Sequence, residues 1–302
     1  MVDITHKSNT LRIATAQAIV KVSLQATIDA IQNDTVPKGN VFAMSKAAGL
    51  LGVKKTPELL PDCHPMPIEF TGITYEIEGL NVVVKVTVKT IYKTGVEVEA
   101  MHGASVVALN MYDMLKPIDK GVEIHAIKLL QKKGGKTSYP VRDVSEVKAA
   151  VIVCSDTISQ GKGEDKSGKL IKEKLEGYQV TTKEVEVVPD DFDTIQQRVL
   201  ALKEEYSLIV LTGGTGLSVR DTTPEAILPL LDKRIVGAEE TIRRYGQERM
   251  PYAMLSRSVV GTINNSCLVL ALPGSSKGVV ESLDAVFPHL FHSYKVLTGE
   301  RH

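Results

Sequence analysis

The chain has 302 residues, enough to bury a sizeable core and typical of two domains. Lysine plus arginine and aspartate plus glutamate both number 36, and this balance excludes the strongly basic surface on which nucleic-acid or membrane binding depends. Three scattered cysteines exclude a disulfide framework, no apolar run could span a bilayer, and residues 1–10 are too polar for a signal peptide, so we expect a cytoplasmic protein.

The first half of the chain predicts several helices and one clear strand. A helical pattern runs over residues 7–31, and an amphipathic helix over residues 41–51 ends at Gly52. Residues 81–92 alternate apolar and polar side chains, which predicts a half-buried strand. Residues 96–100 read as extended, and a helix rich in small and apolar side chains follows at 103–115.

Two sets of charged residues in this half stand out. Asp113 and Lys116 are three apart and share a helix face, and an aspartate among apolar neighbours usually has a partner. If residues 96–100 are extended, Glu97 and Glu99 project from one face and repel unless cations or a donor-rich ligand, such as a guanine edge, lie near. The plain alternatives are a structural Asp–Lys pair and a solvated sheet face.

A loop at residues 59–67 places prolines on both sides of Cys63 and His64, which fixes where His64 points. No second Cys or His pair stands at ligand spacing, so a metal site is not indicated. A single loop histidine is more often structural than catalytic. Arg12 read alone is a solvated charge, and Lys54 follows a helix end where cations are favoured in any case.

Together these features resemble the cyclic pyranopterin monophosphate synthase (MoaC) family. The resemblance runs from Met1 to about Lys136 and implies an α+β, ferredoxin-like domain with an antiparallel sheet and helices. The similar blocks are VDITHKSNTLR, KGNVFAMSKAAG, KKTPELLPDCHP, KTGVEVEAM, MYDMLK and KKGGKTS.

The resemblance implies a substrate and a set of roles. The substrate is (8S)-3',8-cyclo-7,8-dihydroguanosine 5'-triphosphate, which the family rebuilds into cyclic pyranopterin monophosphate with loss of pyrophosphate. That chemistry needs cations for the triphosphate, acid–base groups and a polar clamp for the purine. The matching positions are Lys38, Asp113 and Lys116 for catalysis, with burial expected to lower the pKa of either lysine, and Arg12, Lys54, Asp62, Cys63, His64, Glu97, Val98 and Glu99 for binding. No tightly bound cofactor is expected in this half. Val98 stands where many relatives carry Met.

Residues 132–148 are rich in Lys, Gly, Ser and Thr and predict a linker. We place the domains at 1–143 and 147–302. The second half then alternates strands, at 148–154, 182–188, 206–211 and 267–272, with helices, at 167–175, from Asp193 or Thr194 to 205, and from 276. This alternation predicts a three-layer α/β domain with a mostly parallel sheet and helices on both faces.

A glycine-rich turn, LTGGTGLSVRDTTPEA at residues 211–226, follows the third of these strands. Its glycines allow positive φ angles and close approach of backbone N–H groups to an anion, and Thr222 or Thr223 can cap the next helix. Strand, anion-sized loop and helix N-terminus together form a phosphate site. Asp221 beside that loop would repel phosphate unless Mg²⁺ lies between. The P-loop and dinucleotide motifs do not fit, and GGTG alone is equally typical of a tight surface turn.

Other polar segments also follow strands. In a parallel sheet, Ser155-Asp156, Pro189-Asp190, the glycine loop and Pro273-Gly274-Ser275 all come to the carboxyl edge, where ligands bind. The edge therefore predicts a nucleotide site with Mg²⁺. Each aspartate taken singly could instead be a helix cap, the reading favoured for Asp193.

This half resembles the molybdopterin adenylyltransferase family, which includes MogA, MoaB-like proteins and the gephyrin G domain. The similar blocks are SDTISQGKGEDKSG, VVPDD, LTGGTGLSVRDTTPEA, MLSR and LPGSSKG. The resemblance implies transfer of AMP from ATP to the terminal phosphate of molybdopterin with Mg²⁺, releasing pyrophosphate. It implies that Asp190 and Asp221 bind the metal and catalyse adenylyl transfer. The residues that it places around the nucleotide or the pterin are Ser155, Asp156, Asp165, Ser167, Thr212, Gly213, Gly214, Thr215, Gly216, Gly274 and Ser275.

The sequence thus predicts one bifunctional enzyme of molybdenum cofactor biosynthesis. Its small-molecule partners would be the cyclic guanosine triphosphate, molybdopterin and ATP, and the resemblances imply a homo-oligomer, a trimer or a hexamer. The main alternative is an active first half fused to a non-catalytic pterin-binding or scaffold domain. A nucleotide-binding regulator without chemistry is a further alternative.

Overall fold

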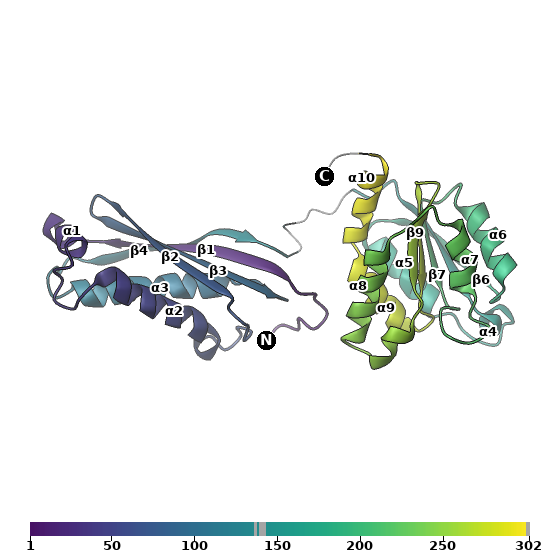
Figure 1. The fold of residues 1–302 in the computed structure, drawn as a ribbon, viewed down its shortest axis with the longest axis horizontal. Coiled ribbons are helices and arrows are strands. Elements are labelled where there is room, and N and C mark those ends of the chain that lie inside the picture. Colours follow the sequence, from purple (N-terminus) through teal and green to yellow (C-terminus); the bar gives the residue numbers. More distant parts are fainter. Residues whose placement is uncertain (136–137, 139–142, 300–302) are drawn as a thin grey trace. The chain divides into compact units, whose positions relative to one another are not determined.

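The computed structural model describes residues 1–135, 138 and 143–299, which form two compact units, Met1–Pro140 and Val141–His302 (Figure 1). The predicted linker at 132–148 lies partly outside the described residues, and the domain limits at 143 and 147 stay a prediction. In the described part of the chain, no helix is long and apolar enough to cross a membrane.

The first unit is a four-stranded antiparallel sheet covered on one face by two long helices (Figure 1). The strand order is β2-β3-β1-β4. The predicted α+β antiparallel arrangement is confirmed. Its elements are β1 (Thr10–Lys21), α1 (Gln25–Gln32), α2 (Val41–Leu59), β2 (Phe70–Glu78), β3 (Asn81–Tyr92), α3 (Glu97–Leu115) and β4 (Glu123–Lys133).

The expected helix over residues 7–31 is wrong for Thr10–Lys21, which form strand β1, and only the part from Gln25 onward is helical, in α1. Ala14, Ala16, Ala18 and Val20 are all buried, and the residues between them are half-buried. That is a period of two, which belongs to a strand. The alanines suggested a helix by propensity, but here they are small side chains that let α3 pack closely on the sheet.

Two helix boundaries also differ from expectation. Residues 96–100 are not extended, since α3 begins at Glu97 and places Glu97 and Glu99 in its first turn. Gly52 does not end its helix, because α2 continues to Leu59. A Cβ on Gly52 would stand 2.8 Å from a methyl carbon of Val106, so this glycine permits close approach of α2 to α3.

The second unit is a six-stranded sheet with helices on both faces, as predicted (Figure 1). The strand order is β6-β5-β7-β10-β9-β8; β5, β6, β7 and β10 are parallel, and β9 pairs antiparallel with both β10 and the edge strand β8. The strands are β5 (Lys148–Cys154), β6 (Thr181–Val188), β7 (Leu208–Thr212), β8 (Lys233–Arg234), β9 (Val259–Ile263) and β10 (Cys267–Leu272).

Two apolar cores flank this sheet. Helices α5 (Ser167–Gly177), α8 (Val236–Gln247) and α9 (Ser276–Val286) pack on one face, and α6 (Phe192–Leu202) and α7 (Thr223–Ile227) on the other. Two short helices, α4 (Asp156–Ser159) and α10 (Ser293–Leu297), complete the unit. Asp191 caps α6, in place of the expected Asp193 or Thr194, by accepting a hydrogen bond from the Thr194 backbone N–H. Thr222 is at the N-cap position of α7 but makes no capping hydrogen bond.

Candidate active sites in the two halves

The first group of predicted residues lies at the C-terminal end of α3. Lys38 Nζ is 2.7 Å from one carboxylate oxygen of Asp113, and Lys116 Nζ is 2.7 Å from the other. Hydrogen bonds from Lys116 and Lys38 lower the pKa of Asp113 to about 2. The hydrogen bond to Asp113 raises the pKa of Lys116. The expected lowering of this pKa by burial is therefore wrong, because the Lys116 side chain is exposed in one copy of the chain. The three residues form an exposed ionised cluster with a net positive charge.

The second group lies near the N-terminal end of the same helix. Glu99 is 1% exposed, and its Oε1 accepts a hydrogen bond from the Cys63 thiol at 3.0 Å. Burial and the neighbouring Glu99 raise the pKa of Cys63 to about 12, so the thiol stays protonated and remains a donor at neutral pH. Oε2 of Glu99 is buried and has no hydrogen-bond partner among the described residues. His64 Nε2 lies 2.8 Å from the carbonyl oxygen of Val2.

The remaining predicted binding residues of this half differ in how they are held. Arg12 donates to the carbonyls of Tyr92 and Lys93, at 3.2 and 3.3 Å. Glu97 is paired with Lys132 at 3.6 Å. The Asp62 side chain is 93% exposed and pairs with the N-terminal amine, which places it in solvent. Lys54 and Val98 are also exposed.

The two groups do not meet in one chain. Glu99 and Asp113 are fourteen residues apart in the single helix α3. At about 1.5 Å per residue, this spacing separates the two residues by roughly 21 Å. That distance is too long for a single cyclic nucleotide to bridge. Helix α2 runs antiparallel to α3, since Thr56 in its last turns contacts His102 at 3.0 Å, so the Cys63 loop that follows α2 stays at the Glu99 end.

We expect Cys63→Ala to destabilise the first unit. Removing the thiol leaves both carboxylate oxygens of a buried Glu99 without a donor, which costs about 1–3 kcal/mol of unfolding free energy. Cys63→Ser is the matched control, because its hydroxyl can donate in the same direction. Calorimetry of the full chain measures both variants. Equal melting temperatures for Cys63→Ala and Cys63→Ser would show that the contact does not matter.

In the second half, segments that follow four strands surround a cavity of about 410 Å³ at the carboxyl edge of the sheet. Glu164 and Lys166, which the sequence did not single out, also line it. The predicted residues that line it are Ser155, Asp165, Ser167, Asp190, Thr212, Gly213, Gly214, Gly274 and Ser275. Asp156, Thr215, Gly216 and Asp221 are not part of its lining but lie in the segments next to it.

The glycine loop needs its glycines for two reasons. Gly213 and Gly214 have φ angles of 99° and 62°, in the left-handed region. A Cβ on Gly213 would collide with the carbonyl oxygen of Cys154, and a Cβ on Gly214 would stand 3.0 Å from Oδ1 of Asp190. The main chain of the loop therefore lies directly against the neighbouring strand end and the Asp190 carboxylate.

Asp190 and Asp156 hold one another through the main chain. The backbone N–H of Asp156 donates to Oδ2 of Asp190 at 3.2 Å, and that of Asp190 donates to Oδ1 of Asp156 at 3.1 Å. Oδ1 of Asp190 is buried without a partner among the described residues. Burial is the main cause that raises the pKa of Asp190, and the charges of Asp156 and Asp221 act in the same direction. A cation beside this oxygen would satisfy it and offset the repulsion.

Asp221 is fixed at the far end of the loop. Its Oδ2 accepts from the Ser218 N–H at 2.8 Å, and its own N–H donates to the Ser218 carbonyl at 3.0 Å. In the described part of the chain no group of three or more His, Cys, Asp or Glu could hold a metal. Two carboxylates are nevertheless what a magnesium ion takes from a protein when phosphates and water supply its other ligands.

Two predicted residues form hydrogen bonds with the loop at Pro273–Ser275, and a third holds the start of α5. Ser167 donates its hydroxyl to the carbonyl of Gly274 at 2.7 Å, and Thr212 donates to the carbonyl of Pro273 at the same distance. Asp165 accepts from the backbone N–H of Gly168 at 2.9 Å, in the first turn of α5. These side chains therefore hold the cavity wall in place. The hydrogen bonds that they make in doing so leave them fewer donors and acceptors for a ligand.

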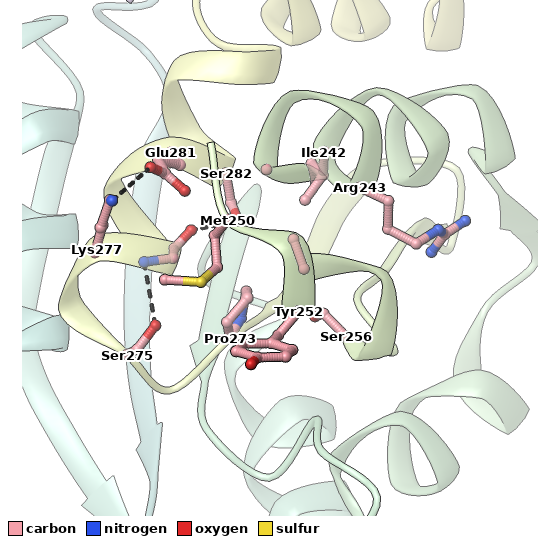
Figure 2. Close-up of a pocket in the computed structure, with 13 residues that line it drawn as sticks. Ile242, Arg243, Met250, Tyr252, Ser256, Pro273, Ser275, Lys277, Glu281 and Ser282 are labelled. Carbon is pink, nitrogen blue, oxygen red and sulfur yellow. Dashed lines mark hydrogen bonds and ion pairs between the residues drawn. The ribbon is translucent and has the colours of Figure 1, made fainter. Parts of the chain in front are cut away.

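A second cavity of about 220 Å³ lies between α8, α9 and the 3-10 helix η3 (Pro251–Leu255) (Figure 2). Its wall is mainly apolar, with Ile242, Met250, Tyr252, Ala253 and Pro273. Arg243, Ser256, Ser275 and Lys277 add polar groups. Ser275 lines both cavities, so they share a wall at the end of β10. The sequence did not predict this cavity, although Ser256, which lines it, belongs to the block MLSR.

Comparison with known proteins divides the chain in the same way. The MoaC family model matches residues 1–135, and the model described as "Probable molybdopterin binding domain" matches residues 150–292. A "Molybdenum cofactor biosynthesis bifunctional protein" of Chlorobaculum tepidum is 37% identical over 100% of this chain and 96% of its own length. A cyclic pyranopterin monophosphate synthase of Syntrophomonas wolfei is 42% identical over 47% of this chain and 92% of its own.

A solved structure of MoaB from Thermus thermophilus is 37% identical and covers 51% of this chain and 98% of its own, with a TM-score of 0.48. The match to the Chlorobaculum protein extends over both units, and the two family models each match one of them. The chain therefore belongs to the family of bifunctional molybdenum cofactor biosynthesis proteins, with a MoaC-family half followed by a molybdopterin-binding domain of the MoaB/MogA kind.

Proposed function

We propose that the first half converts (8S)-3',8-cyclo-7,8-dihydroguanosine 5'-triphosphate into cyclic pyranopterin monophosphate and pyrophosphate. The observation that supports this most is the ionised cluster of Lys38, Asp113 and Lys116. Two ammonium groups on one carboxylate give a cationic centre for a triphosphate. Each lysine is also paired with one carboxylate oxygen of Asp113. When the substrate displaces these ion pairs, the lysine and the carboxylate can exchange protons with it.

The polar clamp for the purine is the buried carboxylate of Glu99. Its partnerless Oε2 can accept two N–H groups of a guanine edge, and the Cys63 thiol holds the other oxygen. This group and the lysine cluster are roughly 21 Å apart along α3. We therefore infer that the site is completed by a second copy of the chain, with the cluster of one copy facing the Glu99 group of another in a homo-oligomer, a trimer or a hexamer.

We propose that the second half adenylylates molybdopterin with Mg-ATP and releases pyrophosphate. The supporting observation is the cavity where the glycine loop meets Asp190. The donor set fits Mg²⁺, because a buried carboxylate oxygen of Asp190 lacks a partner and Asp221 stands at the other end of the loop. Bound Mg²⁺ would neutralise charge on the phosphates during transfer.

The chain's own residues supply the rest of that site. The main-chain N–H groups of the glycine loop can donate to phosphate oxygens, and Ser155, Ser275 and Ser276 add hydroxyls. The smaller, mainly apolar cavity, which Tyr252 helps to line (Figure 2), is suited to a flat heteroaromatic ring, and Ser275 lines both this cavity and the larger one proposed for the phosphates. A ligand with a ring at one end and phosphate at the other could thus occupy both cavities across one loop.

Two assays on the full chain test these proposals separately. With the cyclic guanosine triphosphate we expect pterin monophosphate and one equivalent of pyrophosphate, and Asp113→Ala should abolish both. With molybdopterin, ATP and Mg²⁺ we expect adenylylated molybdopterin. Binding of molybdopterin without any adenylylated product would favour the scaffold alternative for the second half. Pterin formation unaffected by Asp113→Ala would favour a nucleotide-binding regulator.

A further inference from the structure

The segment that carries Asp221 has little regular structure of its own. Residues 213–222 connect β7 to α7 as a loop, and Leu217 and Val219 on it are 69% and 98% exposed. Exposed apolar tips of this kind contribute little to holding a loop in place. The position of the Asp221 carboxylate must therefore be set by contacts made elsewhere on the loop.

The Ser218 N–H holds the Asp221 carboxylate within the loop, and Arg257, just beyond η3, supplies contacts that tie the loop to the rest of the unit. Its Nε donates to the carbonyl of Gly216 at 2.8 Å, and its Nη2 donates to the carbonyl of Asp221 at 2.7 Å. Its Nη1 pairs with Glu225 in α7. The backbone N–H of the same residue donates to the carbonyl of Thr215 at 3.1 Å. One residue thus ties both arms of the loop, before and after its exposed tip.

We propose that Arg257 is a positioning residue for adenylyl transfer, which holds the loop, and with it the Asp221 carboxylate, in place. This inference rests on the proposed function of the second half. The planar guanidinium can reach two carbonyls and a carboxylate at once, whereas a lysine ammonium at the same place cannot span all three. The adjacent Ser256 lines the smaller cavity.

A purely structural role would give a different pattern. If Arg257 only stabilised the fold, its substitution would lower the melting temperature and leave the metal dependence of the folded enzyme unchanged. If it positions Asp221, the loop loosens while the sheet stays intact, and the carboxylate is presented less often. The Mg²⁺ concentration for half-maximal activity then rises, and the effect depends on Asp221 itself.

The experiment compares Arg257→Lys with Arg198→Lys in the full chain. Arg198 is the matched control, since its guanidinium binds Glu186 at 2.9 and 2.7 Å at the β6–α6 side, away from the loop. For Arg257→Lys we expect a roughly tenfold higher Mg²⁺ concentration for half-maximal adenylyl transfer, about 1.4 kcal/mol of lost metal affinity. For Arg198→Lys we expect no change. The double variant Arg257→Lys with Asp221→Asn should be no worse than Asp221→Asn alone.

Hydrogen exchange gives a readout that does not need activity. The backbone amides of Ser218 and Asp221 should exchange at least tenfold faster in Arg257→Lys than in the parent, and at parent rates in Arg198→Lys. If the parent makes no adenylylated product but this difference is seen, the proposed function fails and the positioning role stands. Parent exchange rates and parent Mg²⁺ dependence in Arg257→Lys would overturn the inference.

A second variant covers the case in which Arg257→Lys does not fold. Glu225→Gln keeps the three backbone bonds of Arg257 and weakens only its ion pair. We expect it to raise the half-maximal Mg²⁺ concentration about twofold to threefold and to speed exchange at Asp221. Parent values for both measurements in a folded Glu225→Gln would likewise count against the proposal.

Discussion

Two inactive variants of the first half should restore activity when their chains are combined. Asp113→Asn removes the centre of the lysine cluster, and Glu99→Gln changes the buried carboxylate roughly 21 Å away along α3. Each alone should lower the rate of pterin formation about 10²–10⁴-fold. If a site takes its cluster from one copy and its Glu99 from another, a mixed pair carries one site with both defects and one intact site.

The expected yield of this complementation can be calculated. A site between two copies is intact when one brings an intact lysine cluster and the other an intact Glu99, which random mixing makes true of about one site in four. Activity should therefore return to about a quarter of the parent after the two chains are unfolded together and refolded. A pairing of Asp113→Asn with Lys116→Ala, both in one cluster, is the control and should stay inactive. A site contained within a single copy predicts no recovery for either mixture.

Asp190→Asn should abolish adenylyl transfer and at the same time make the second unit more stable at neutral pH. The loss should be about 10²–10³-fold, because an amide cannot replace a metal-binding carboxylate. The gain follows from burial, which disfavours the charged form of Asp190 and raises its pKa. Asparagine keeps an acceptor for the Asp156 N–H without the charge.

The pH dependence of that gain has a definite sign. A carboxyl with a raised pKa in the folded state costs stability at every pH at which it is ionised, and this cost vanishes below its ordinary value of 3.8, where both states are protonated. The difference in melting temperature between Asp190→Asn and the parent should thus be positive at pH 7 and shrink toward zero at acid pH. Asp193→Asn, an exposed acid in α6, should show neither effect. A lower melting temperature for Asp190→Asn at pH 7 would show that burial of this carboxylate is not a cost.

The second half could be predicted from the sequence more closely than the first. Its central strands β5, β7 and β10 are nearly continuous apolar runs, and β5 and β10 begin and end where the sequence placed them. In the first half the alanine-rich β1 was mistaken for a helix, because alternation of small side chains is a weak signal beside the helix propensity of alanine. The pairing of β1 with β3 and β4 overrides that propensity.

The candidate sites show a similar limit. Residues next to strand ends, such as Asp190 and Gly213, could be brought together by topology alone, because parallel strands end at one edge. No such rule applied to the first half, where the distance between Glu99 and Asp113 follows from a helix that begins six residues earlier than expected. The role of Arg257 could not be predicted either, since two of the three partners of its guanidinium are main-chain carbonyls, which leave no trace in residue type.

The close contact of α2 with α3 helps to set the distance between the Cys63 loop and Glu99. Gly52 faces Val106, and the loop leaves α2 only a few residues later. Any side chain at this position would meet Val106 and force α2 away from α3, and we expect the Cys63 loop that follows α2 to shift with it. The Glu99 carboxylate, which we propose as the purine clamp, is therefore positioned in part by a residue that does not touch it, and we expect substitution of Gly52 to lower purine selectivity.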